Sequence, residues 1–325
     1  MDKKIKKFGR IGVLMGGCST EREISLKSGK AVYESLSSQG FDVLALDVRE
    51  NTDDKIKNLL RESEINLAFI ALHGKIGEDG QIQSICEELR IPYTGSDSKS
   101  SRIAFNKVST QQLLKKNGLN VAGSVIFQPK EKIDLLKVNS VLKTYPLIVK
   151  PACEGSSIGV TVVKSADGLV KAIEHGQSFG HEVLIEEFID GRELTVGILE
   201  EKALDVVEVM TEATFFDFTA KYESGLTKYK VPADLSMEEK YLMQGAALKV
   251  HTLIGCKDLS RVDFILDRRN KPFVLEINTI PGFTKTSLLP KAALCAGINF
   301  DQLCVKLLEL AYDKTKKESF SVLDH

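Results

Sequence analysis

Two short extended runs near the C-terminal end bring four polar side chains onto one surface. The runs, residues 261–267 and 272–278, are typical of a β-hairpin around a polar turn that pairs Asp267 with Pro272. Because successive side chains of a strand point to opposite faces, one face of this hairpin is polar and the other apolar. The polar face carries Arg261, Asp263, Glu276 and Asn278, and the apolar face carries Val262, Phe264, Leu266, Phe273, Leu275 and Ile277.

The predicted register places two acidic groups against each other. Asp263 lies directly opposite Glu276, and Arg261 lies opposite Asn278. Two carboxylates about 5 Å apart destabilise such a pair unless a cation lies between them. Oxygen ligands of this kind suit Mg²⁺. The hairpin alone leaves two interpretations open, a magnesium site or an ordinary hairpin with a solvated outer face.

The composition is that of an ordinary globular protein. At 325 residues and 43% hydrophobic, the chain is long enough for two or three domains. With 44 basic and 45 acidic residues, its net charge of -1 favours neither nucleic acid nor an anionic membrane as partner. Six scattered cysteines form no metal-binding pattern, so we expect them reduced and mostly buried. No stretch approaches the roughly 20 apolar residues needed to span a bilayer, and we expect a cytoplasmic protein.

The first hundred residues alternate predicted strands and helices. Strands are expected at 10–15, 41–47 and 67–72, and helices at 20–38 and 52–64. The third strand is almost wholly apolar, as in a parallel strand covered on both faces. This pattern predicts a doubly wound α/β domain over residues 1–100. Ligands of such domains bind beyond the carboxyl ends of the strands, where the polar loops 16–21 and 73–80 lie.

Two further units follow the first domain. We predict an α+β unit over residues 101–185 and a third unit over residues 186–325. The second unit holds a helix at 98–116, strands at 124–127, 147–150, 160–163 and 182–188, and a helix at 166–174. The third holds strands, a long loop at 211–231, a helix opened by a capping box at Ser236, the hairpin, and two final helices.

The loop at residues 151–159 has three possible roles. It contains Gly-x-Ser-x-Gly around Ser157, the nucleophile elbow of serine hydrolases. An elbow needs a helix directly after the serine, whereas the β-branched run 160–163 predicts a strand. The loop could instead wrap its backbone N–H groups around phosphates, with Lys150 to neutralise them. A surface hairpin is the third possibility.

The N-terminal loops carry two further candidates. Gly-x-Gly-x-x-Gly is absent after the first strand, which argues against a nucleotide-binding module without catalysis. Glu21 suits an amine, or alternatively interacts with the dipole of a helix capped by Ser19 or Thr20. His73 ends a strand, where a hydrogen-bonded structural role is the alternative to a role in the site. The aromatic loop 214–222 is a predicted lid.

Taken in chain order, six segments closely resemble the D-alanine:D-alanine ligase family of the ATP-grasp superfamily. They are residues 16–26, 72–80, 149–159, 216–222, 261–263 and 276–284. The resemblance implies an ATP-grasp fold with an N-terminal doubly wound, parallel-sheet domain. It also implies that ATP phosphorylates one D-alanine and that the amine of a second attacks the acyl phosphate, giving D-alanyl-D-alanine for peptidoglycan. Homodimers are the expected assembly.

The resemblance also implies roles for individual residues in phosphoryl transfer. Two Mg²⁺ ions, for which Mn²⁺ is a substitute, would be held by Asp263, Glu276 and Asn278. The oxyanion of the tetrahedral intermediate would be stabilised by Arg261 and the backbone N–H of Gly282. ATP would be bound by Lys107, Lys150, Ser157, Glu186, Phe188, Ile189 and Glu193.

Further roles concern the amino acids. Glu21 would receive the ammonium group of the first D-alanine, with Ser156 and Tyr222 as partners that hold it. The second substrate would be bound by Lys221, Ser287 and Leu288, with His73 beside both substrates. Tyrosine at 222 favours D-alanine over D-lactate, and D-serine stays an open alternative. Asn106 and Cys153 depart from the family pattern near the ATP site.

Overall fold

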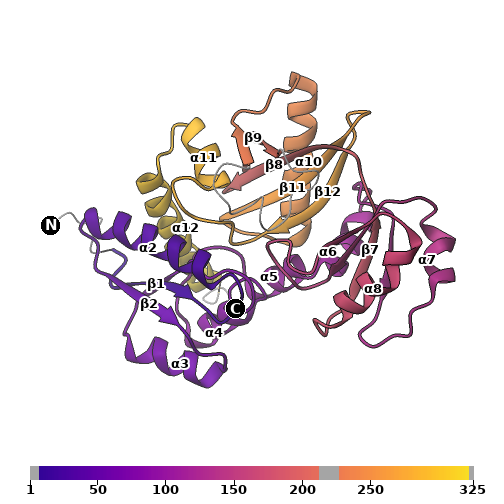
Figure 1. Ribbon diagram of the computed structural model, residues 1–325. Helices are drawn as coiled ribbons and strands as arrows, with labels where there is room; N and C mark the ends of the chain where they lie inside the picture. The colour runs from indigo at the N-terminus through magenta and orange to yellow at the C-terminus, as the bar shows by residue number, and fades with distance from the viewer. Residues whose placement is uncertain (1–6, 212–226, 322–325) are drawn as a thin grey trace.

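The described part of the chain forms three β-sheets, one in each predicted unit (Figure 1). The structure is a computed structural model that describes residues 7–211 and 227–321. Its helices and strands confirm the predicted mixture of α/β and α+β segments. The six cysteines are free thiols, and of these Cys86, Cys256 and Cys304 are buried.

The N-terminal sheet is parallel, with strand order β2-β1-β3. Its strands are β1 (Ile11–Gly16), β2 (Val43–Val48) and β3 (Leu67–Ile70), and its helices are α2 (Arg22–Ser38), α3 (Asp53–Glu62) and α4 (Gln81–Leu89). Side chains of β1 alternate between two cores: Val13 packs with Leu36 of α2, while Leu14 packs with Ile56 of α3 and Ile82 of α4. Both faces of the sheet are therefore covered, as the doubly wound prediction requires.

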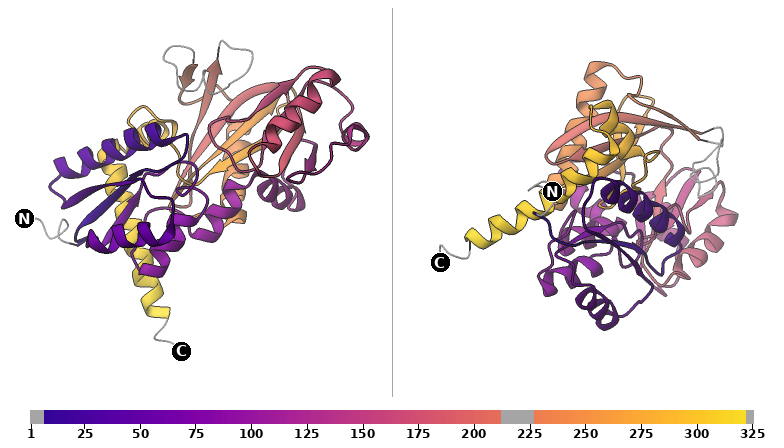
Figure 2. Two further views of the ribbon diagram at one scale, coloured as in Figure 1. Left: turned by 60° about the horizontal axis from the view of Figure 1, so that its bottom comes forward. Right: turned by 90° about the vertical axis from the view of Figure 1, so that its left-hand side faces the viewer.

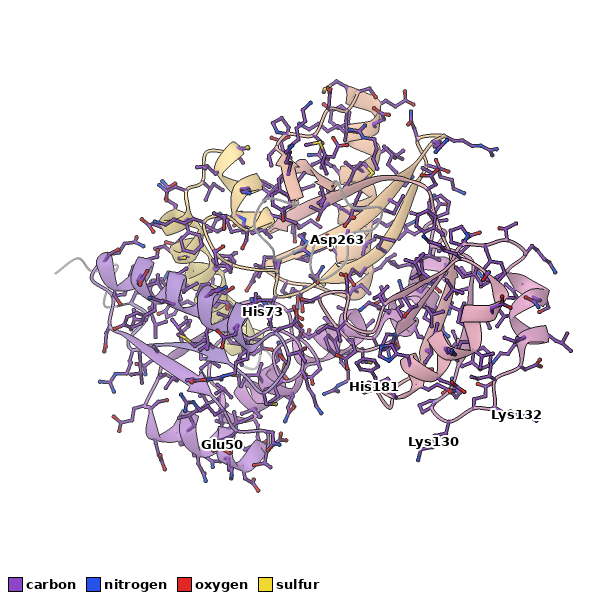
Figure 3. All side chains as sticks on the ribbon, viewed as in Figure 1. Glu50, His73, Lys130, Lys132, His181 and Asp263 are labelled. Atoms are coloured by element: carbon purple, nitrogen blue, oxygen red, sulfur yellow. The ribbon has the colours of Figure 1, made fainter. Side chains whose placement is uncertain are left out.

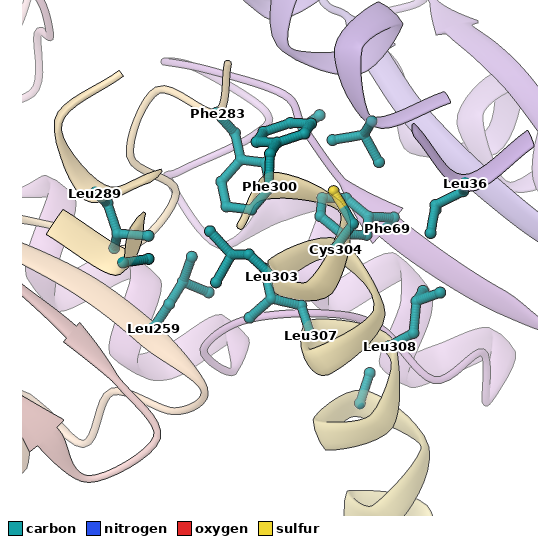
Figure 4. Packing of buried hydrophobic residues seen from close by; sticks show 14 of the residues in the cluster. Leu36, Phe69, Leu259, Phe283, Leu289, Phe300, Leu303, Cys304, Leu307 and Leu308 are labelled. Carbon is teal, nitrogen blue, oxygen red and sulfur yellow. The ribbon is translucent and has the colours of Figure 1, made fainter. Parts of the chain in front are cut away.

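The last helix of the chain returns to this first domain. Helix α12 (Phe300–Ser321) packs on the same face of the sheet as α2 and runs beyond it (Figure 2). Leu303 and Leu307 of α12 share a core with Leu36 and Phe69 (Figure 4). The segment 186–325 thus supplies part of the N-terminal core, which no local pattern in the sequence indicated.

The central sheet is antiparallel, with strand order β4-β7-β5-β6. Its elements are β4 (Ser124–Phe127), β5 (Leu147–Pro151), β6 (Thr161–Val163), β7 (Val183–Glu187), α7 (Leu135–Val141) and α8 (Ala166–Gln177). Strands β5 and β6 pair as the predicted hairpin around the loop 152–160. Strand β7 pairs with β5 as far as Glu187, so the central sheet extends beyond residue 185.

The helix predicted over residues 98–116 is two helices. Helix α5 (Ser98–Phe105) ends at Asn106, and α6 (Lys107–Lys116) begins directly after it. Asn106 has extended backbone angles, φ -86° and ψ 104°, and its side chain accepts a hydrogen bond from the N–H of Ser109 at 2.9 Å. It therefore acts as the N-cap of α6, an interaction that competes with a continuous helix.

The C-terminal sheet is antiparallel, with strand order β10-β9-β8-β11-β12. Its elements are β8 (Gly191–Leu199), β9 (Lys202–Thr211), β10 (Thr227–Lys230), β11 (Leu259–Asp267), β12 (Pro272–Asn278), α10 (Met237–Ile254) and α11 (Leu288–Cys295). The predicted capping box at Ser236 is present at the start of α10. One core holds Val250 of α10 together with Val262 and Phe264 of β11.

The hairpin of β11 and β12 has the predicted register only at the end away from its turn, where the four polar residues lie. Asp263 faces Glu276 and Arg261 faces Asn278, but Leu266, not Asp267, faces Pro272. The Asp267 carboxylate accepts the backbone N–H groups of the turn, at 2.8 Å from both Arg269 and Lys271. Asp267 therefore belongs to the turn, and the pairs next to the turn are shifted by one residue from the prediction. A β-bulge between Asp263 and Phe264 corrects this shift, so the pairs beyond it have the predicted register.

The bulge changes which side chains of β12 face the core. Val274 is buried against α10 and β11, whereas Leu275 lines a cavity on the other face. Phe273 is only half-buried. The prediction that Phe273 and Leu275 belong to the apolar face is therefore wrong, because a single extra residue reverses the alternation of the strand.

Candidate active site

A cavity of about 510 Å³ lies between the central and C-terminal sheets. Its lining includes every residue expected to bind ATP, namely Lys107, Lys150, Ser157, Glu186, Phe188, Ile189 and Glu193. Two residues of the expected metal set, Asp263 and Glu276, line the same cavity. The fold thus brings together residues from β5, α6, β7, β8 and the hairpin.

The cavity also has walls that the sequence analysis missed. Met210, Ile265 and Leu275 supply apolar surface. Arg192 of β8 makes a bidentate ion pair with Glu208 of β9, with both N–O distances 2.8 Å. The alternation of side chains in β8 and β9 could have indicated that Arg192 and Glu208 face the cavity. The same pattern could not have indicated Leu275, because the bulge interrupts the alternation in β12.

The two lysines of the cavity are held by different partners. Lys150 Nζ lies 2.6 Å from a carboxylate oxygen of Glu186, and both side chains are buried. Lys107 Nζ donates to the carbonyl oxygen of Glu154 at 2.5 Å and lies 3.4 Å from Glu276. The loop after β5 and the hairpin lie on opposite sides of the cavity, and Lys107 contacts both.

The hairpin carboxylates are matched by positive charge and hydrogen-bond donors. Arg261 binds Asp263 through two N–O contacts of 2.8 and 2.7 Å. Thr195 donates to Asp263 at 2.6 Å, and the Asn278 amide donates to it at 3.1 Å. Figure 3 shows Asp263 near the centre of the molecule. The acidic pair is thus held in place by cations of the protein.

The donor set fits a hard cation. In the described parts of the chain, no group of three His, Cys, Asp or Glu side chains could hold a metal ion. The hairpin offers two carboxylates and one amide, which are oxygen ligands only. Mg²⁺ commonly binds one or two carboxylates and completes its shell with water and substrate phosphates. Asp263 and Glu276 suit that partial coordination.

Glu21 lies at the start of α2 and faces the central domain. It is the N-cap residue, but its side chain makes no capping hydrogen bond. Its carboxylate instead accepts a hydrogen bond from the hydroxyl of Ser156. The predicted caps Ser19 and Thr20 are therefore wrong, and Ser19 donates to the carbonyl oxygen of His73 at 2.9 Å.

Glycines allow two loops to close on the Glu21 carboxylate. A Cβ atom added at Gly155 would lie 2.5 Å from a Glu21 oxygen, and one at Gly74 would lie 2.6 Å away. Both distances are shorter than real Cβ contacts, so a larger residue at either position would displace the Glu21 carboxylate from its present place. Ser156, with φ 51°, adopts the left-handed conformation that directs its hydroxyl to Glu21.

Glu78 is a buried carboxylate near Glu21 that the sequence analysis did not single out. Its carboxylate accepts the N–H of Gly74 at 3.0 Å, which fixes the loop beside Glu21. Burial raises the pKa of Glu78 well above its usual value, and the nearby charge of Glu21 raises it further. Its position in the same polar loop as His73 was the available signal.

His73 is buried, with both ring nitrogens hydrogen-bonded to the protein. Nδ1 lies 3.0 Å from the carbonyl oxygen of Ile280, and Nε2 lies 3.0 Å from the hydroxyl of Ser28. Because a carbonyl only accepts, the proton is on Nδ1. Burial lowers the pKa of His73 to about 4, so the ring is neutral at neutral pH. His73, which is labelled in Figure 3, thus joins the first domain to the segment after β12 through its contact with Ile280.

The remaining predicted residues lie in the segment after β12 or outside the described chain. Gly282 precedes Phe283, whose N–H donates to Ser28 at 3.2 Å. Ser287 accepts the N–H of Thr284 at 3.0 Å and is the N-cap of α11, which begins at Leu288. Lys221 and Tyr222, with the whole of the predicted lid 214–222, fall outside the described residues.

The serine hydrolase alternative does not fit this geometry. Ser157 is followed by strand β6, which pairs with β5. A nucleophile elbow requires a helix at that point.

Comparison with known proteins identifies the family. The description "D-ala D-ala ligase N-terminus" matches residues 47–96, and "D-ala D-ala ligase C-terminus" matches residues 113–309. The chain belongs to the D-Ala D-Ala ligase family. A D-alanine--D-alanine ligase of Geotalea uraniireducens (strain Rf4) is 42% identical over 305 residues, which are 94% of this chain and 96% of the relative.

Solved structures show the same fold. A D-alanine--D-alanine ligase from Bacillus anthracis complexed with ATP has a TM-score of 0.84 and 31% identity, covering 95% of this chain and 99% of that one. The VanG D-Ala:D-Ser ligase from Enterococcus faecalis has a TM-score of 0.80 and 32% identity, covering 93% and 99%. The two antiparallel sheets around the cavity are the lobes of the ATP-grasp fold, as expected. ATP-dependent formation of D-alanyl-D-alanine is the function of the D-Ala D-Ala ligase family.

One finding concerns membranes. Among the helices described, none is both long and apolar enough to cross a bilayer.

Proposed function

We propose that this chain joins two D-alanine molecules at the meeting point of two cavities. The cavity of about 510 Å³ between the central and C-terminal sheets, called the nucleotide cavity below, ends at the loop after β5, where Glu154 and Ser157 line it. A second cavity of about 360 Å³ contains Glu21 and is bordered by Glu154 and Gly155 of the same loop. This shared loop is the observation that carries the proposal, since it sets a phosphate site beside a site for an amino group.

Binding of the first substrate follows from the charges. The ammonium group of D-alanine pairs with Glu21, which Ser156 holds in place. The substrate carboxylate then points toward the nucleotide cavity and the side chain of Arg261. Binding both groups fixes the carboxylate oxygen in line with the phosphate that it accepts, which lowers the entropic part of the barrier.

The hairpin would hold Mg²⁺ through Asp263, Glu276 and Asn278. When bound with ATP, Mg²⁺ neutralises charge that develops on the transferred phosphoryl group. Lys107 and Lys150 add positive charge from the opposite wall. The ATP-complexed relative supports the nucleotide assignment, and the oxygen donors of the hairpin support the metal assignment.

Bond formation then requires stabilisation of an oxyanion. The amine of the second D-alanine attacks the carbonyl carbon of the acyl phosphate, and negative charge develops on the carbonyl oxygen. Collapse of this intermediate breaks the bond to the phosphate oxygen, so inorganic phosphate leaves and the amine gives up its proton. Arg261 and the N–H of Gly282 are the proposed donors. The bidentate contact with Asp263 holds the guanidinium of Arg261 in a fixed plane, so little reorganisation is needed.

The direct test supplies purified protein with ATP, Mg²⁺ and D-alanine. We expect ADP, inorganic phosphate and D-alanyl-D-alanine in equal amounts. Absence of dipeptide over a range of pH and substrate concentration would contradict the proposal. Parallel reactions with D-serine or D-lactate as competing second substrate, analysed by mass spectrometry, test the preference that Tyr222 indicates.

The assembly and location are also proposals. Family resemblance supports a homodimer acting in the cytoplasm. Light scattering of the purified chain at micromolar concentration tests the first, and a monomer would contradict it.

A further inference from the structure

A network of polar side chains next to the nucleotide cavity connects Ser124 to Lys150. The hydroxyl of Ser124 donates to Gln111 Oε1 at 2.5 Å. Gln111 Nε2 donates to Glu186 Oε1 at 2.7 Å. The other oxygen of Glu186 lies 2.6 Å from Lys150 Nζ. These residues come from four elements, β4, α6, β7 and β5 in that order.

Three residues of this network are buried, so a lost hydrogen bond would not be replaced by water at low cost. Gln111 is 9% exposed, Glu186 6% and Lys150 7%. A buried ion pair is stable only when its remaining lone pairs also find donors. Lys150 satisfies one oxygen of Glu186, and the amide of Gln111 satisfies the other. Without that amide, the Glu186 carboxylate would be free to rotate or to draw in water.

The direction of the Gln111 amide is fixed at both ends. A carboxylate only accepts hydrogen bonds, so the NH₂ group of Gln111 must face Glu186. Its oxygen then faces Ser124, whose hydroxyl supplies a donor. Because Gln111 is neutral, it orients Glu186 without competing with Lys150 for the carboxylate charge. Sequence analysis gave Gln111 no role.

We propose that Gln111 is a positioning residue for nucleotide binding. By fixing the Glu186 carboxylate, it holds Lys150 Nζ at the wall of the cavity where the lysine meets ATP phosphates. Gln111 itself does not line the cavity and so acts through Glu186. This inference rests on the proposed function in one respect, that Lys150 contacts the nucleotide.

The test compares the same substitution at neighbouring positions of α6. Gln111→Met keeps the length of the side chain but removes both hydrogen bonds, while Gln112→Met alters an exposed neighbour. Because hydrogen bonds to a charged group are among the stronger ones, we expect Gln111→Met to raise the Kd of Mg²⁺-ADP and the KM of ATP by about tenfold. The KM of D-alanine and the constants of Gln112→Met should stay within about twofold of wild type.

Calorimetric titration with Mg²⁺-ADP separates the two possible failures. If wild type binds no nucleotide, the proposed function fails. If wild type binds nucleotide and forms dipeptide but Gln111→Met binds ADP equally well, only the role of Gln111 is overturned. Equal increases in the KM values of ATP and D-alanine would also overturn it, since they indicate general damage to the fold.

Gln111→Glu provides a second variant of almost unchanged volume. The charged groups around this position are Glu186 of β7, Lys150 of β5 and, one turn earlier on α6, Lys107. At low pH the introduced carboxyl is protonated and can donate to Glu186 as the amide does. As the pH rises, it ionises and repels Glu186, so the Kd of Mg²⁺-ADP relative to wild type should rise by about tenfold. A constant ratio between pH 5.5 and 9 would overturn the proposal even if Gln111→Met does not fold.

Discussion

The hydroxyl of Ser156 donates a hydrogen bond to the carboxylate of Glu21, across 135 positions of the sequence. Glu21 lies at the start of α2 in the N-terminal domain, and Ser156 lies in the loop between β5 and β6 of the central domain, so this contact exists only where the two domains meet. Gly74 and Gly155 allow the loops of both domains to approach the same carboxylate. The amino-acid pocket is therefore a property of the interface between domains, and substitutions there test the assignment.

Glu21→Gln should weaken the use of D-alanine selectively. The variant keeps the size of the side chain but removes the charge that pairs with the substrate ammonium. We expect the KM of D-alanine to rise at least about tenfold, and that of ATP to stay within about twofold. Steady-state kinetics measure both. Glu23→Gln, exposed on the same helix, is the matched control, and an unchanged KM for D-alanine in Glu21→Gln would count against the pocket.

Asp263→Asn should impair metal use. Loss of one carboxylate from the hairpin lowers turnover by at least about thirtyfold, because metal charge contributes several kcal/mol to the transition state. The concentration of Mg²⁺ needed for half-maximal rate should rise as well. Asp267→Asn, in the turn of the same hairpin, should alter thermal stability alone. If Asp263→Asn shows the Mg²⁺ dependence of wild type, the metal assignment is wrong.

The bulge in β12 predicts opposite effects for adjacent residues. Val274→Ala removes buried methyl groups from the core and should cost about 2 kcal/mol of unfolding free energy. Leu275→Ala removes a wall of the nucleotide cavity, so it should raise the KM of ATP by severalfold with a smaller loss of stability. Urea denaturation and kinetics distinguish the two. Were Leu275→Ala the more destabilising variant, the regular register predicted from sequence would hold instead.

Buried histidines predict that stability falls in mild acid. Burial lowers the pKa values of His73 and His251 to about 4, against an ordinary value of 6.5. A neutral histidine in the native state gives its full contribution above pH 6.5, and this is lost as the pH falls toward 4. Each would contribute a loss of about 3 kcal/mol over that range. Urea denaturation between pH 8 and 4.5 should show the decline.

A pair of variants assigns this decline to its source. His251 does not line the cavity, and His251→Gln should make the free energy of unfolding less dependent on pH. His175→Gln, which is exposed on α8, should keep the wild-type dependence. Identical pH profiles for both variants would show that burial of His251 is not responsible.

Local pattern determined much of the architecture. Alternating and apolar runs predicted the strands of the first domain, the hairpin of β5 and β6, and the facing pairs Asp263 with Glu276 and Arg261 with Asn278. These features depend on side-chain periodicity and on short connections, and both can be recognised from residues that are close together in the sequence. Family resemblance added the ATP residues, and the structure gathers all of them around one cavity.

Tertiary structure decided what depends on competition between interactions or on distant contacts. Asn106 caps a second helix where propensity alone favoured a continuous one. Asp267 is held by the backbone of its turn, and the resulting bulge moved Leu275 from the core to the cavity. Glu21 meets Ser156, and Gln111 meets Glu186, only because separate elements pack together. Sequence spacing sets which side chains share a face of one element, whereas packing between elements sets which faces meet.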